Sequence, residues 1–139
     1  MKKNVYKVGD TLEYRRLISP EDVAEFHGEV IHPVYATFAL ARDAEWTSRQ
    51  FVPDLCEENE EGIGTMLSIE HRSPAFIGEE IVFRAKVQTI TQNELICVFE
   101  ATVGDRLIAT GKTGQKILKL DALEKLFYGK VIDKRRDKQ

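Results

Sequence analysis

Hydrophobic and polar residues alternate along much of the second half of the chain, with the two-residue period of a β-strand. The alternation is clear over residues 63–71, 81–89 and 95–103, and a fourth strand-like run spans 107–120. Turn residues separate these runs: Ser73-Pro74 with Gly78, Gln92-Asn93, and Gly104-Asp105. Because tight turns join the last three runs, we expect these to pair as an antiparallel meander.

A helical period appears over residues 37–52. Apolar residues occupy most positions around its first half, which predicts a helix buried on several sides. Thr37 is the predicted N-cap, while Pro33 and Pro53 bar a helix just before and just after the segment. Glu45 lies between two apolar neighbours, so we expect it to be the buried acid of this helix.

The two ends of the chain complete the predicted fold. A strand is expected over residues 10–18, and proline with acidic residues predicts a short helix over 20–26. The tail, residues 129–139, has mixed charges and is expected to be frayed, flexible surface. Together the elements predict an α+β fold in which an antiparallel sheet wraps around one long helix. One sheet cannot cover that helix on all sides, so we expect a dimer.

Composition restricts the class of protein. A length of 139 residues predicts a single domain over residues 1–139, and 42% hydrophobic with 31% charged residues is typical of a globular chain. Cys56 and Cys97 form no CxxC pair, which argues against a zinc site and fits a reducing compartment. The net charge of −3 does not favour a nucleic-acid partner. Without a membrane-spanning run or an apolar signal segment, a cytoplasmic protein is expected.

Three side chains are candidates for chemistry: Thr37, Glu45 and His71. Thr37 and Glu45 lie about two turns apart on the predicted helix, and His71 ends a predicted strand, so all three can border one cleft. A carboxylate near an imidazole suits general acid–base work, and a helix N-terminus favours developing negative charge. Each residue also has an ordinary explanation, as a cap, a solvated glutamate or a strand-end histidine. The histidine spacing lacks the usual zinc motifs, so no metal is expected.

The residues around these positions resemble a known family. They are Val34-Tyr35-Ala36-Thr37, Ala44-Glu45-Trp46, the run from Gly64 to His71, Pro74, and Ile77-Gly78-Glu79. In this order and spacing they look like the fluoroacetyl-CoA thioesterase type of hotdog-fold protein, over about residues 34–120. The resemblance implies a dimeric hotdog domain, with the active site at the subunit interface, that hydrolyses acyl-CoA. It implies no cofactor, because CoA is part of the substrate.

The same resemblance assigns Thr37, Glu45 and His71 as the catalytic residues. Glu45 attacks the thioester or activates water, His71 relays protons to the leaving sulfur, and Thr37 orients the glutamate or holds the oxyanion. The sequence leaves these roles open. Gly64 matches a glycine next to the acyl pocket, where the absence of a side chain is expected to leave room for the thioester.

Further residues are expected to bind the substrate. The fluoroacetyl-specific enzymes have an aromatic gate before the threonine, where this chain offers Phe26, Tyr35 and the aliphatic Ile31. We therefore expect these three residues to line the acyl pocket, with only modest discrimination between acetyl- and fluoroacetyl-CoA. Arg72 and Lys112 are candidates for the CoA phosphates.

Two other functions remain open on the same fold. A hydratase or dehydratase would carry its histidine on the helix, which this chain lacks. A non-catalytic, metabolite-sensing module would keep the CoA groove without needing both Glu45 and His71. Because both residues are present, a small acyl-CoA thioesterase is the favoured hypothesis. The acyl chain, the pathway and the choice between dimer and tetramer are not decided by the sequence.

Overall fold

The computed structural model describes residues 1–26 and 28–137, without the side chains of residues 24, 26, 30, 31 and 129–137. The elements, in chain order, are β1 (Thr11–Leu17), a 3-10 turn η1 (Pro20–Asp22), β2 (Val23–Phe26), β3 (Glu29–Tyr35), α1 (Thr37–Arg49), α2 (Val52–Leu55), β4 (Glu60–His71), β5 (Glu80–Thr91), β6 (Glu94–Val103), β7 (Arg106–Lys119) and α3 (Leu120–Asp137).

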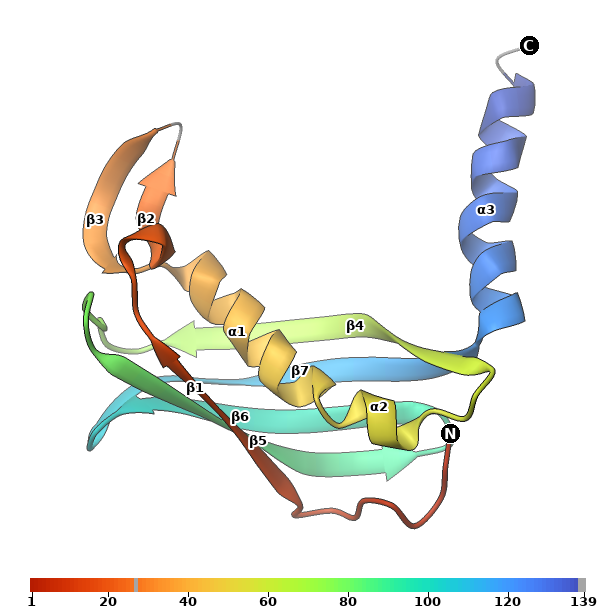
Figure 1. The fold of residues 1–139 in the computed structure, drawn as a ribbon, viewed down its shortest axis with the longest axis horizontal. Coiled ribbons are helices and arrows are strands. Elements are labelled where there is room, and N and C mark those ends of the chain that lie inside the picture. The colour runs from red at the N-terminus through yellow and green to blue at the C-terminus, as the bar shows by residue number, and fades with distance from the viewer. Residues whose placement is uncertain (27, 138–139) are drawn as a thin grey trace.

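Five of these strands form an antiparallel sheet in the order β1-β5-β6-β7-β4, and α1 lies across one face of it (Figure 1). The expected meander is confirmed as β5-β6-β7, whereas β1 and β4 form the two edges. A separate ribbon of β2 and β3 stands beyond the N-terminal end of α1. The α+β fold with one long helix against a sheet is therefore confirmed, and β4 is left as an edge strand beside α1.

The helix packs on the sheet through a stripe of small and apolar residues. The buried positions of α1 are Ala39, Leu40, Asp43, Ala44, Thr47 and Ser48. Ala39, Leu40 and Ala44 share one core cluster with Ile81 and Phe83, two of the inward residues of β5. Each large apolar side chain buried in this way contributes about 1.5–3 kcal/mol. The opposite face of α1 is exposed, with Phe38 52% and Trp46 53% exposed. Within the described residues of a single chain, the helix is therefore not buried on several sides as predicted.

The boundaries of α1 differ from the prediction. Ala36, in an extended conformation, occupies the N-cap position and Thr37 is the first helical residue, so the predicted cap is wrong. Pro53 does not simply end a helix; it lies in the first turn of α2, where its missing N–H costs nothing. The buried acid of α1 is Asp43, which is 3% exposed, whereas Glu45 is half-buried.

Both ends of the chain also differ. The short helix expected over residues 20–26 ends at Asp22, and the chain continues as β2. Where a frayed tail was expected from residue 129, the helix α3 runs on to Asp137 and leaves the sheet at the end of β7 (Figure 1). Within the described residues, no helix is both long and apolar enough to cross a membrane.

A cluster of charges around the buried Asp22 and Asp43 fixes the N-terminal half of α1. Asp22 receives hydrogen bonds from Arg16 at 2.7 Å and from Arg42 at 3.0 Å, while Arg42 also bonds to Asp43 at 3.0 Å. The hydroxyl of Tyr35 donates to Asp43. These five residues join β1, η1, β3 and α1, so the helix is tied to both the sheet edge and the ribbon that precedes it.

The charge cluster also sets the ionisation of Asp22. Burial would raise the pKa of this carboxyl, but hydrogen bonds from Arg16, the Ser19 backbone and Arg42 together outweigh burial and lower it to about 2. A carboxyl whose pKa is lower in the folded state than its ordinary value of 3.8 stabilises the fold above that value. The contribution is lost as the pH falls through about 2.

We predict that Asp22→Asn lowers the free energy of unfolding at pH 7 by roughly 2 kcal/mol, the equivalent of this pKa shift. The difference between parent and variant should shrink below about pH 4 and vanish only below about pH 2, because the parent carboxyl becomes neutral as the pH falls through its folded pKa. Urea denaturation followed over this pH range measures it. A difference that stays constant with pH would show that the charge of Asp22 is not what stabilises the cluster.

Candidate active site

Thr37 and His71 form the first half of the candidate site. Thr37 opens α1, His71 ends β4, and the hydroxyl oxygen of Thr37 lies 3.0 Å from His71 Nδ1. Just before Thr37, the backbone N–H of Ala36 donates to the carbonyl of Asp22 at 2.8 Å. The threonine is therefore held by the same segment that the charge cluster anchors.

Burial favours the neutral form of the His71 imidazole. Burial lowers the pKa of His71 below its ordinary value, and a backbone hydrogen bond with Ser73 acts weakly in the opposite direction. One ring nitrogen of a neutral imidazole donates and the other accepts. Nδ1 faces Thr37, while Nε2 is buried and has no hydrogen-bond partner within the described part of the chain.

Glu45 and Gly64 form the second half. A Cβ placed on Gly64 would lie 2.5 Å from Glu45 Oε1, closer than real Cβ atoms approach. The glycine thus makes room for the carboxylate of Glu45 against β4, rather than only for a thioester as the resemblance implied. Because residue 64 has no side chain, the carboxylate of Glu45 can lie directly against the sheet.

A β-bulge brings Gly64 and His71 to the same face of β4. Gly64 pairs with Gln115 on β7, and after the extra residue Thr65 the ladder resumes at Met66. In a regular strand, residues seven apart point to opposite faces. The bulge adds one residue and reverses this relation, so both positions face α1.

The bulge also changes the alternation read from the sequence. Leu67 and His71 face α1 as expected, but Ile63 lies before the bulge and faces the other way. The prediction that positions 63–71 alternate in a single phase is therefore wrong.

Two residues beside Glu45 were not singled out from the sequence, Arg49 and Gln115. Arg49 donates to Gln115 Oε1 at 3.3 Å and to the carbonyl of Gly62 at 3.1 Å. Gln115 is 1% exposed, although it is polar. A signal did exist: Gln115 has the same strand phase as the apolar Ile117, so a two-residue period places it inside.

The two halves are separate within one chain. Thr37 and Glu45 lie eight residues apart on α1, which is about 12 Å along the helix axis. The structure thus forms two groups along α1 and β4. One group is Thr37 with His71, and the other is Glu45 with Gly64 and Gln115.

A hollow of about 550 Å³ opens beside the second group, between the end of α1, α2 and the start of β4. Trp46, Arg49, Gln50 and Gly62 are among its lining residues. Trp46 follows Glu45 directly in α1, so the hollow lies near the second group without being lined by its carboxylate.

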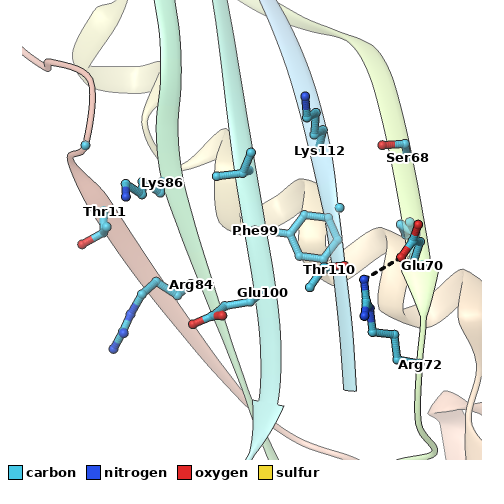
Figure 2. A pocket seen from close by; sticks show the side chains of 14 residues that line it. Thr11, Ser68, Glu70, Arg72, Arg84, Lys86, Phe99, Glu100, Thr110 and Lys112 are labelled. Carbon is cyan, nitrogen blue, oxygen red and sulfur yellow. Dashed lines mark hydrogen bonds and ion pairs between the residues drawn. The ribbon is translucent and has the colours of Figure 1, made fainter. Parts of the chain in front are cut away.

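Arg72 and Lys112 lie on the other side of the sheet. They line a groove of about 1020 Å³ on the face away from α1, with the charged side chains Arg84, Lys86 and Glu100 (Figure 2). Arg72 pairs with the carboxylate of Glu70 at 2.8 Å. We assign the chemistry to the α1 face despite the larger groove, because Thr37, Glu45 and His71 all lie there.

The expected acyl-pocket residues contribute little to the described site. Tyr35 is 1% exposed, and burial, with its hydrogen bond to Asp43, raises the pKa of its hydroxyl. The side chain of Tyr35 is thus part of the core and the charge cluster. The side chains of Phe26 and Ile31 lie outside the described residues. Among the residues that the structure describes, no group of three or more His, Cys, Asp and Glu side chains is arranged to hold a metal ion.

We predict that Gly64→Ala costs within about 1 kcal/mol of folding stability, because the new methyl group meets only the mobile end of Glu45. Gly111→Ala, on the facing strand, should cost roughly 3 kcal/mol or more, because its methyl group would meet the backbone oxygen of Ser68 and the Phe99 ring. Chemical denaturation of both variants measures the difference. Equal losses would mean that Gly64 is needed for packing rather than for the carboxylate.

The chain is similar to several proteins of known structure. A hypothetical protein of Thermus thermophilus, described as a thioesterase superfamily member, is 27% identical, with a TM-score of 0.86 over 96% of this chain and 97% of that one. The fluoroacetyl-CoA thioesterase FlK is 20% identical, with a TM-score of 0.77 over 94% and 98%. A hot-dog-like protein of Thermanaerovibrio acidaminovorans is 18% identical, with a TM-score of 0.83 over 90% and 93%.

These structural matches establish the hotdog fold. A comparison with curated protein sequences finds no significant match. The family model described as FlK, fluoroacetyl-CoA-specific thioesterase, matches residues 18–121, which include Thr37, Glu45, Gly64 and His71. The chain therefore belongs to the FlK family of fluoroacetyl-CoA-specific thioesterases.

Proposed function

We propose that this protein is a thioesterase that hydrolyses small acyl-CoA thioesters. The observation that carries the proposal is the carboxylate of Glu45 resting on Gly64, on the sheet face that also presents the Thr37–His71 pair. Thioester hydrolysis needs a base or nucleophile and a group that stabilises the developing oxyanion. Membership of the FlK family supports the same reaction class.

The neutral state of His71 determines its part in this mechanism. We assign the Thr37 hydroxyl as the donor to Nδ1, and this assignment places the imidazole proton on Nε2. Nε2–H then donates a hydrogen bond to the thioester oxygen as negative charge develops on it. Thr37 fixes the tautomer, and Glu45 supplies the base or the nucleophile.

The complete site requires a second copy of the chain. The two groups lie about 12 Å apart along α1, too far to act on one carbonyl. In the described part of the chain no strand pairs with the outer side of edge strand β4, where Met66 and Leu67 at its middle are 40% and 39% exposed. Antiparallel pairing of two β4 strands, about an axis between Leu67 and Ser68, sets Gly64 of one copy opposite His71 of the other. The dimer thereby joins Glu45 of one chain to the Thr37–His71 pair of its partner.

The same arrangement limits how CoA is held. The acyl group lies on the α1 face, so a contact of Arg72 or Lys112 would be confined to the nucleotide end of CoA, beyond the sheet. Phe26 and Ile31 remain proposed acyl-pocket residues, with modest discrimination between acetyl- and fluoroacetyl-CoA. We propose a cytoplasmic enzyme that needs no cofactor, because CoA enters with the substrate.

The proposed activity is tested by thiol release from a panel of small acyl-CoAs. Glu45→Gln and His71→Ala should each lower kcat/KM by roughly two orders of magnitude or more, the usual range for losing an acid–base or oxyanion group. Both variants should fold, because neither side chain belongs to the apolar core. Gly64→Ala should lower the rate as well, since it displaces the Glu45 carboxylate.

Two outcomes would contradict this function. Parent-level rates in both variants would show that the chemistry lies elsewhere. Tight binding of acyl-CoA without thiol release by the parent protein would instead identify a non-catalytic binding module.

The dimer is tested by light scattering, where the parent should have twice the mass of one chain at micromolar concentration. Leu67→Glu should weaken the dimer, because it brings charges of the same sign close together at the axis. Leu17→Glu on the opposite edge strand β1, where Leu17 is 67% exposed, is the matched control and should stay dimeric. A monomeric parent, or dissociation by the control alone, would rule out the β4 interface.

A further inference from the structure

The helix α3 carries an apolar stripe that continues beyond the surface on which the helix starts. Leu120, Leu123, Leu126 and Phe127 are spaced three or four residues apart, so they share one face of α3. Leu123 is only 6% exposed, and the helix contacts β7 where it begins. One turn further on, Leu126 and Phe127 are 43% and 49% exposed. The same face is therefore covered by its own chain at the start of α3 and exposed after that.

The helix also extends away from its own domain. It leaves the sheet after Lys119, the last residue of β7, and runs past the outer edge of β4 (Figure 1). The β2–β3 ribbon extends past the same edge from the opposite end of the sheet (Figure 1). With 18 residues, α3 is about 27 Å long. Helices in proteins owe most of their stability to packing of an apolar face, so a surface that covers Leu126 and Phe127 is expected.

A second apolar surface lies at the end of the sheet where β4 finishes. It consists of Phe76 and Ile77, in the loop between β4 and β5, and Leu107 at the start of β7, all three of which are exposed. We call these three residues the loop patch. The Arg106 guanidinium lies 5.7 Å from the centre of the Phe76 ring, and the hydroxyl of Ser73 donates to the carbonyl of Leu107 at 2.6 Å. These contacts hold the loop patch in a defined position.

Antiparallel pairing of two β4 strands brings the two surfaces together. Lys119 lies opposite Glu60, so α3 begins beside the start of β4. In the proposed dimer, the start of one β4 lies beside the end of the other, which carries the loop patch of the partner. Neighbouring strands are about 4.8 Å apart, so the partner's β4 is about 10 Å from β7. Leu126 and Phe127 are six and seven residues beyond Leu120, also about 10 Å along α3, and therefore come level with it.

We propose that α3 of each copy docks on the loop patch of its partner through Leu126 and Phe127. A second copy suits this position because both surfaces are exposed and apolar, and because a twofold axis forms the contact twice. The inference rests on the β4 pairing proposed above and not on hydrolysis itself. Since α3 lies almost wholly beyond residues 18–121, which the family model matches, the contact does not follow from family membership.

Cross-linking between introduced cysteines tests the contact directly. Cys56→Ser is used as the background, because Cys97 is fully buried. In this background, Phe127→Cys combined with Ile77→Cys should give a covalent dimer with a short bismaleimide, seen on a denaturing gel. Tyr128→Cys combined with Ile77→Cys is the matched control. Tyr128 is the next residue of α3 but points about 100° further around the helix, off the apolar stripe, so it should cross-link much less.

The α3 contact should also strengthen the dimer. Phe127→Ser removes an apolar side chain from both copies of the contact, so it should raise the Kd of the dimer by roughly 100-fold. Tyr128→Ser makes a similar change outside the stripe and should leave the Kd within about threefold of the parent value. Sedimentation of the two variants over a dilution series measures the difference.

Three results would overturn the inference: a monomeric parent, no covalent dimer from the Phe127–Ile77 pair, or equal effects of the Phe127 and Tyr128 variants. A dimeric parent whose Kd does not change in Phe127→Ser would limit the interface to β4 and would overturn the α3 contact alone. A parent that passes these tests but releases no thiol from acyl-CoA would contradict the proposed function, while the α3 contact would stand.

Discussion

Gly64 carries no side chain, and the carboxylate of Glu45 lies where that side chain would be. This close approach of helix to sheet is the constraint on which the rest of the site depends. The small buried residues of α1 allow the helix to lie near the sheet, and the bulge after Gly64 turns the following half of β4 so that His71 faces the same helix. A side chain at position 64 would move the acid, and a regular strand would turn the histidine away.

The charge cluster around the buried Asp22 and Asp43 serves the other end of the helix. Asp22 and Asp43 bind the two arginines Arg16 and Arg42 and so tie α1 to β1 and to the chain that enters the helix. Thr37 follows directly after this anchored segment, which explains why its hydroxyl is available to His71 rather than used as a helix cap. The ion pairs to these two buried carboxylates hold together segments that are distant in the chain. Here the fixed geometry is the position of a catalytic candidate.

The sequence was sufficient to predict the helices and strands whose signal is a local pattern of hydrophobic and polar residues. The two-residue period located β5, β6 and β7, and the helical period located α1, because these signals arise within a few neighbouring residues. The bulge in β4 and the burial of Asp43 in place of Glu45 were not predictable, since both depend on partners distant in the chain. The Arg49–Gln115 contact joins residues 66 positions apart, and no local pattern reports such a contact. Family resemblance supplied Thr37, Glu45 and His71 together, but not their separation into two groups.

That separation leads to the central claim, a thioesterase site divided between two copies of the chain. Mixing the Glu45→Gln and His71→Ala variants, under conditions where subunits exchange, tests it most directly. A mixed dimer would contain one site with both residues intact, so the mixture should recover about a quarter of the parent thioesterase activity, given random pairing of equal amounts. A mixture no more active than the two separate variants would show that each site is built within one chain, and would contradict the account.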